Sequence, residues 1–182
     1  MENAGSKVSI AFPIGDPNAP NRLEFEDIVM FASPSNVRFI PRAQTREGLN
    51  HCRNVALKML RTLNHTPVSA FGINFQFQGE DGGSEAIWRK LGASELLEEK
   101  PDLGISLGSL SVNKQFVVGD QATLNHQVAA KTDGAATFDF NYHHTCDDVS
   151  SILDALQREL IDQYYETTKS FIRSYYDVEL PE

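Results

Sequence analysis

The stretch FGINFQFQ, residues 71–78, indicates the fold class of this chain more clearly than any other segment. Its large apolar residues alternate with glycine, asparagine or glutamine, and successive side chains of a strand point to opposite faces. One face of such a strand is apolar and the other is polar. This alternation is typical of an antiparallel sheet with one covered face and one face in water. We therefore expect residues 71–78 to form a strand of such a sheet.

Three more strands are predicted on the C-terminal side of this segment, at residues 105–118, 122–131 and 136–143. They are separated by Val118-Gly119-Asp120 and by Thr132-Asp133-Gly134. Both tripeptides contain turn-forming residues, which favour hairpins between neighbouring strands.

Strands are also predicted on the N-terminal side, at residues 7–12, 23–31 and 37–40. The last two are separated by Ser33-Pro34-Ser35-Asn36, whose turn chemistry favours an antiparallel hairpin. The chain is thus expected to contain more hairpins than strand-helix-strand crossovers.

The spacing of apolar residues predicts three helices. The first begins at Thr45, a candidate N-cap, and ends before Pro67. The second begins at Ser84, and the third is a long helix over residues 149–176. The predicted fold class is α+β, a mainly antiparallel sheet of six or seven strands with helices packed on one face, ending in a long C-terminal helix.

The composition is that of an ordinary globular protein, with 41% hydrophobic and 23% charged residues. A chain of 182 residues fits one core, so we expect a single α+β domain over residues 1–182. The sequence has no apolar run long enough to cross a membrane, and its N-terminal stretch lacks the pattern of a signal peptide. Cys52 and Cys146 fall in different predicted elements, which favours free thiols. We expect a cytoplasmic protein.

The net charge of -9 hides an uneven distribution of charged residues. Residues 37–66 contain six bases and one acid, which gives +5, whereas residues 147–182 contain nine acids and three bases, which gives -6. The basic stretch predicts one alternative function, the binding of an anionic partner by Arg38, Arg42, Arg46, Arg53 and Arg61. Nucleic acid is not the partner we expect, because the overall charge opposes it. The acidic segment of the chain itself, in cis or across a dimer, is an equal candidate.

The sequence HHTCDD, residues 143–148, lies where a predicted strand meets the long helix. A cysteine at a helix N-terminus can lose its proton readily, and a nearby histidine can act as a base. The enzyme hypothesis therefore has Cys146 as nucleophile, His143 as base, and Asp147 beside them. Against it, Asp147 opposes a thiolate, and Thr145 and Asp147 are ordinary capping residues. A metal-dependent activity at the same three residues is the other form of this alternative, although structural zinc takes four ligands at set spacings and no second cysteine pair is present. No metal ligand is assigned, and no cofactor is predicted.

The end of the long helix is rich in aromatic residues. A helix of this length extends beyond the length of most strands, so its last turns need another surface to cover them. A second chain would supply that surface, and two-fold pairing is the commonest arrangement. The predicted interface residues are Tyr164, Phe171, Ile172 and Tyr175. The alternative is that the helix packs these residues across the sheet of its own chain.

Features of interaction outnumber features of catalysis in this sequence. It contains no nucleophile elbow, no H-E-x-x-H motif and no phosphate-binding loop. We therefore predict a binding or assembly protein that forms a homodimer, with the enzyme and anionic-partner hypotheses as alternatives. No motif identifies a small-molecule ligand.

Overall fold

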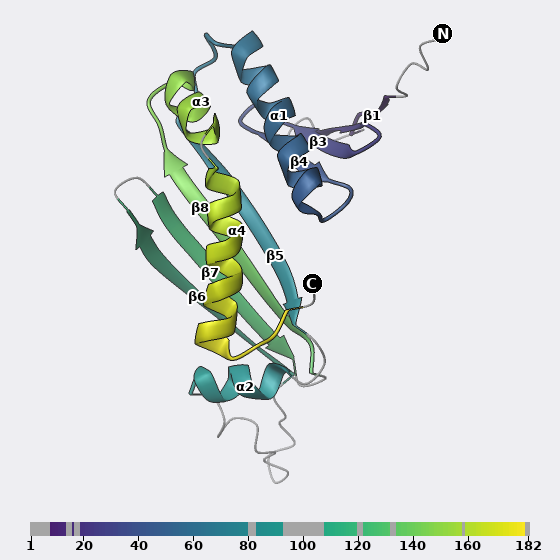
Figure 1. Cartoon of the computed structure of the whole chain (residues 1–182). Coiled ribbons are helices and arrows are strands. Elements are labelled where there is room, and N and C mark those ends of the chain that lie inside the picture. Colours follow the sequence, from purple (N-terminus) through teal and green to yellow (C-terminus); the bar gives the residue numbers. More distant parts are fainter. Residues whose placement is uncertain are drawn as a thin grey trace. The chain divides into compact units, whose positions relative to one another are not determined.

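The computed structural model describes residues 8–13, 16, 19–79, 83–92, 108–119, 122–131, 134–157 and 159–180 (Figure 1). These residues form an α+β fold with antiparallel sheets, as the sequence predicted. Contacts group the chain into two compact units. We call them the first unit, Met1–Thr66 with Leu153–Ile161, and the second unit, Pro67–Ile152 with Asp162–Glu182. A single domain over residues 1–182 stays a prediction.

Sheet 1, in the first unit, consists of four short antiparallel strands in sequence order. They are β1 (Ser9–Ala11), β2 (Asn21–Glu24), β3 (Ile28–Ala32) and β4 (Val37–Pro41). The predicted hairpin between β3 and β4 is confirmed, because the N–H of Ser33 donates to the carbonyl of Asn36. The single strand predicted at residues 23–31 is wrong. The chain turns at Glu26 and Asp27, two polar residues that favour a reversal over a covered strand.

Helix α1 (Arg46–Thr62) lies next to β4 in the first unit. Thr45 is its N-cap, as predicted, and its hydroxyl accepts a hydrogen bond from the N–H of Gly48 at 3.2 Å. Gly48 has no room for a side chain, because a Cβ atom there would collide with the carbonyl oxygen of Ala43. The tight approach of the preceding chain to the first turn of α1 therefore depends on this glycine.

Sheet 2, in the second unit, has four antiparallel strands of ten residues each, in the order β5-β8-β7-β6. They are β5 (Ala70–Gly79), β6 (Ser109–Val118), β7 (Ala122–Lys131) and β8 (Ala136–Thr145). The stretch FGINFQFQ lies in β5, so that prediction is confirmed. Residues 105–107 of the strand predicted at 105–118 lie outside the described residues.

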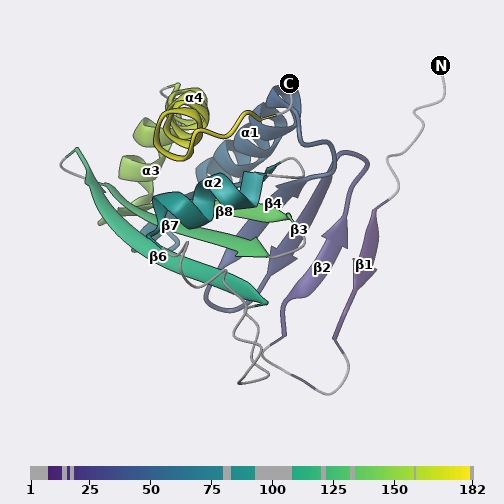
Figure 2. The same ribbon diagram turned by 90° about the horizontal axis from the view of Figure 1, so that it is seen from below.

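The described strands form two sheets of four, which corrects the prediction of one sheet with six or seven strands. Alternation specifies which side chains share a face of a strand, but it does not specify which strand lies beside it. The strands of the two sheets differ in length. Those of sheet 1 have three to five residues, and those of sheet 2 have ten. In the second unit, α4 lies along one face of sheet 2 (Figure 2).

The long C-terminal helix is divided. It consists of α3 (Val149–Gln157), α4 (Leu160–Phe171) and a short π-helix, η3 (Ile172–Tyr176), which continues α4. The predicted long C-terminal helix is present as the 17 residues of α4 and η3, but its predicted length of about 28 residues is wrong, because α3 is a separate helix. Apolar spacing continues through the break, because both helices bury one side, and so the pattern could not reveal it.

Helix α2 (Gly83–Lys90) lies between β5 and β6 in the sequence and places Ile87 and Trp88 in the interior. The last residues predicted for this helix, Leu96 and Leu97, lie outside the described residues. No described helix has both the length and the apolar character needed to cross a membrane.

Candidate binding surfaces

The predicted catalytic cluster does not contain an activated thiol. Burial, Asp147 and Asp148 together raise the pKa of Cys146. No hydrogen bond joins Cys146 to His143 in the described chain; its Sγ lies 3.9 Å from the carbonyl oxygen of Val68 instead. A raised pKa keeps the thiol protonated at neutral pH, so this arrangement does not favour nucleophilic attack.

Part of the same cluster caps a helix. The carboxylate of Asp148 accepts hydrogen bonds from the backbone N–H of Ser151 at 2.8 Å and from its hydroxyl at 2.9 Å. These bonds stabilise the charged carboxylate and lower the pKa of Asp148. Asp147, the predicted third member, lies exposed before α3. Among the described residues, no group of three or more His, Cys, Asp or Glu side chains is arranged to hold a metal ion.

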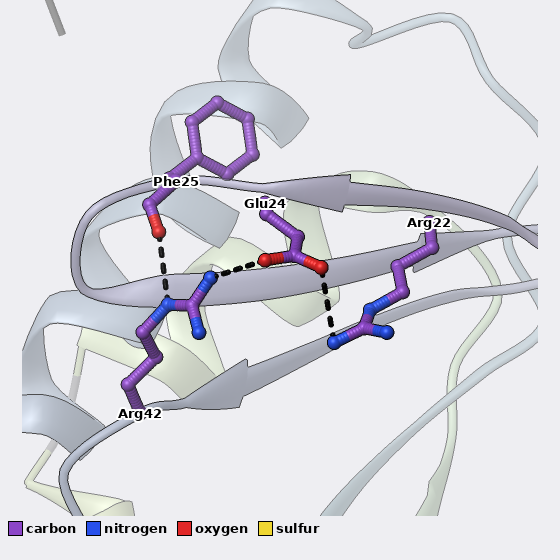
Figure 3. A network of polar contacts seen from close by, with 4 residues as sticks. All are labelled: Arg22, Glu24, Phe25 and Arg42. Carbon is purple, nitrogen blue, oxygen red and sulfur yellow. Dashed lines mark hydrogen bonds and ion pairs between the residues drawn. The ribbon is translucent and has the colours of Figure 1, made fainter. Parts of the chain in front are cut away.

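One arginine of the basic stretch, Arg42, is held by the protein itself (Figure 3). Its Nη2 lies 2.6 Å from the carboxylate of Glu24, and its Nε donates to the carbonyl of Phe25 at 3.1 Å. Arg22 also lies 3.0 Å from the Glu24 carboxylate. The hydrogen bond from Arg42 and the charges of both arginines lower the pKa of Glu24. Arg42 therefore joins β2 to the end of β4, with Arg22 a partner that lies outside the basic stretch.

The other predicted arginines lie on two elements of the first unit. Arg38 is exposed on β4, on the same face of sheet 1 as Arg22. Arg46 begins α1, Arg53 is half-buried in its middle, and Arg61 is exposed in its last turn. The structure thus divides the stretch between a strand and a helix.

The predicted interface residues contact sheet 2 of their own chain. Tyr164 stacks on Tyr142 with 3.9 Å between ring centroids, and Phe171 packs against Phe116 and Phe140. Tyr164 and Ile172 are buried within their own chain. Tyr175 keeps 37% of its surface exposed and is the predicted residue most accessible to a second chain.

Three polar pairs join the C-terminal helix to sheet 2. His126 Nε2 lies 2.8 Å from the Tyr176 hydroxyl, and His144 Nε2 lies 3.0 Å from the Tyr164 hydroxyl. A third bond of 2.9 Å links the hydroxyl groups of Tyr142 and Thr168. All of these side chains are buried. Burial lowers the pKa of both histidines, which favours their neutral form.

The opposite face of sheet 2 is rich in carboxamides. Strand register places two rows of polar side chains side by side across all four strands. One row is Asn74, Asn141, Asn125 and Gln115. The next row is Gln76, Asp139, Gln127 and Asn113. We call these eight residues the carboxamide face. Asparagine and glutamine are visible in FGINFQFQ, but only the register shows that residues from four strands meet.

The edge of sheet 1 exposes apolar side chains. Val8, Ile10 and Phe12, on and beside β1, keep 47%, 51% and 69% of their surfaces exposed. Alternation places them on one face of the strand. The strand itself was predicted, but alternation alone does not show whether the apolar side of a strand is covered.

Comparisons with protein-family models, with curated proteins and with solved structures found no match for this chain.

Proposed function

We propose that this protein is a non-enzymatic assembly protein that pairs with a second copy of itself through β1. The observation that carries the proposal is the exposed apolar edge of sheet 1. Large apolar side chains gathered on a surface commonly mark an interaction site. Here Val8, Ile10 and Phe12 lie on and beside β1, the strand at the edge of sheet 1.

The backbone of β1 supports strand pairing. β1 pairs with β2 on one side, and no described strand pairs with its other side. The outward N–H and C=O groups of an edge strand can bond to another strand. Two antiparallel copies of β1 related by a two-fold axis would present identical groups to each other, which gives a closed dimer.

The apolar side of β1 continues across sheet 1. Register aligns Ile10 with Leu23, Met30 and Phe39, so one row of apolar side chains crosses all four strands. Pairing of two β1 strands would join two such rows into one. The occupant proposed for this edge is therefore a second copy of the same chain.

The expected dimer is weak. Covering the half-exposed Val8, Ile10 and Phe12 contributes about 1 kcal/mol for each side chain, or roughly 6 kcal/mol for the six in a pair. Association costs at least about 4 kcal/mol, and a few strand hydrogen bonds add about 1 kcal/mol each. We therefore expect a dissociation constant between about 10 µM and 1 mM.

Sedimentation velocity over a concentration series tests this proposal. Ile10→Lys places a charge in the joined apolar row, so the variant should stay monomeric while its circular dichroism matches the wild type. Val117→Lys is the matched control, because Val117 is 85% exposed on the second unit and should not affect pairing. A monomeric wild type at about 1 mM, or an Ile10→Lys variant that dimerises as well as the wild type, would refute the proposal.

A further inference from the structure

We infer that the carboxamide face of sheet 2 binds an uncharged polyhydroxylated ligand, a neutral linear oligosaccharide. This inference concerns the second unit and does not rest on pairing through β1. The face lies opposite the one covered by α4, and most of its side chains are exposed.

The scarcity of charge is the first argument. The carboxamide face and the row on each side of it make four rows of four residues, or sixteen positions. Asp139 is the one Asp, Glu, Lys or Arg among these sixteen. The composition of the whole chain, 23% charged, would give about four at sixteen positions, and a solvated surface usually holds more. Exposure to water alone explains why the side chains of this face are polar, but it does not explain why so few of them are charged.

The chemistry of the side chains is the second argument. A carboxamide both donates and accepts hydrogen bonds, as does a hydroxyl group. A pair of neighbouring sugar hydroxyls can therefore bond to one carboxamide in both directions. The two central rows hold no aromatic or large apolar residue, which disfavours an apolar ligand, and the Asp139 carboxylate disfavours an anion.

The central row is incompletely satisfied by the protein. Oδ1 of Asn141 is buried and has no hydrogen-bond partner in the described chain. By contrast, Gln115 donates to Asn125 at 2.9 Å, and Gln76 donates to Asp139 at 2.7 Å. An unpaired buried acceptor requires an explanation, because it costs free energy. A ligand hydroxyl that reaches this oxygen would supply the missing donor.

The spacing of the strands along a row fits a linear ligand. Neighbouring strands lie about 4.8 Å apart, which is close to the length of one sugar ring in a linear chain. An oligosaccharide that lies along the row that contains Asn141 would therefore meet one carboxamide with each ring. The flat, four-strand row favours an extended chain over a compact monosaccharide.

Titration calorimetry with the full chain tests the inference. The probes are cellohexaose, maltohexaose and chitohexaose, with a heparin hexasaccharide as the charged comparison. At least one neutral probe should bind, with an affinity that does not change when salt is raised, because a neutral ligand is not screened. Asn125→Ala should weaken binding about fivefold, the effect of one hydrogen bond. Asn54→Ala, an exposed carboxamide on α1, should not change it.

Three results would overturn the inference. The first is that none of the three neutral probes binds at millimolar concentration. The second is that Asn125→Ala binds as well as the wild type. The third is that only the heparin probe binds, with an affinity that falls as salt rises, because that ligand would be anionic.

Discussion

Acidification from pH 7.5 to 5.5 should destabilise the second unit through His126 and His144. His126 donates through Nδ1–H to the carbonyl of Asp139, because a carbonyl can only accept, and its Nε2 accepts from the Tyr176 hydroxyl. Burial lowers the pKa of His126, and the nearby Lys114 lowers it further while the bond to Asp139 opposes the change. Burial and His143 lower the pKa of His144. The neutral form of both side chains is therefore favoured in the folded state.

The direction of the effect follows from proton binding. Below the unfolded-state pKa of 6.5, the unfolded chain binds protons that the folded histidines do not. The contribution of these two histidines to the free energy of unfolding is thus full above pH 6.5 and falls as the pH drops below it. Each histidine can contribute up to about 1.4 kcal/mol per pH unit, so the two together can remove roughly 2 to 3 kcal/mol at pH 5.5. This is an upper limit, because protonation in the folded state reduces it.

Urea unfolding followed by the fluorescence of Trp88 measures this loss. Trp88 is the single tryptophan and is buried in the second unit, so its emission reports unfolding there. The carboxylates with lowered pKa values, Glu24 and Asp148, lose their contribution only as the pH falls below about 4.5. The window from pH 6.5 to 5.5 therefore isolates the histidines.

The double variant His126→Gln with His144→Gln is the control for this measurement. It should be less stable than the wild type at pH 7.5, yet change much less between pH 7.5 and 5.5. Equal unfolding free energies of the wild-type protein at the two pH values would refute the reasoning, and so would an unchanged pH dependence in the double variant.

Two further substitutions test the packing of each unit. Phe171→Asp places a carboxylate against Phe116 and Phe140, so it should lower the free energy of unfolding by about 3 kcal/mol or more. The urea midpoint measured by Trp88 fluorescence should fall accordingly. A folded variant of unchanged stability would contradict this packing. Gly48→Ala should destabilise the first unit by about 1 to 3 kcal/mol, because its Cβ would meet backbone, although alanine normally favours a helix. Thermal unfolding followed by circular dichroism measures the effect of Gly48→Ala, with Asn54→Ala as the control in α1. A gain in stability would contradict the prediction, because it would show that the backbone near Gly48 moves easily to make room for the Cβ atom.

Local features of the fold were predictable because they depend on neighbouring residues. The alternation in FGINFQFQ gave the two faces of β5, and the Thr45 cap of α1 followed from side-chain chemistry at a helix start. The grouping of strands into two sheets was not predictable in the same way. It depends on pairing partners, and the apolar face of a short strand such as β3 resembles that of a long one.

The candidate surfaces were harder to predict than the elements that carry them. Asn141 and Asn74 are far apart in the sequence, and only the pairing of β5 with β8 aligns them in one row. Similarly, the salt bridge between Arg42 and Glu24 requires β2 and the end of β4 to meet. The aromatic residues of the C-terminal helix were identified from the sequence, but their spacing is equally suited to a second chain and to their own sheet, which is where Tyr164 packs.

The two proposals together account for why weak contacts would be useful to this protein. Each carboxamide-hydroxyl bond contributes only about 1 kcal/mol after desolvation, so one carboxamide face cannot bind a short neutral oligosaccharide tightly. A dimer formed through β1 would carry two such faces. A polymeric ligand with repeated sugar units could then occupy both, and linkage of two weak sites raises the overall affinity when one ligand can reach both of them. If both proposals hold, binding to such a polymer should therefore be tighter at protein concentrations at which the chain is paired.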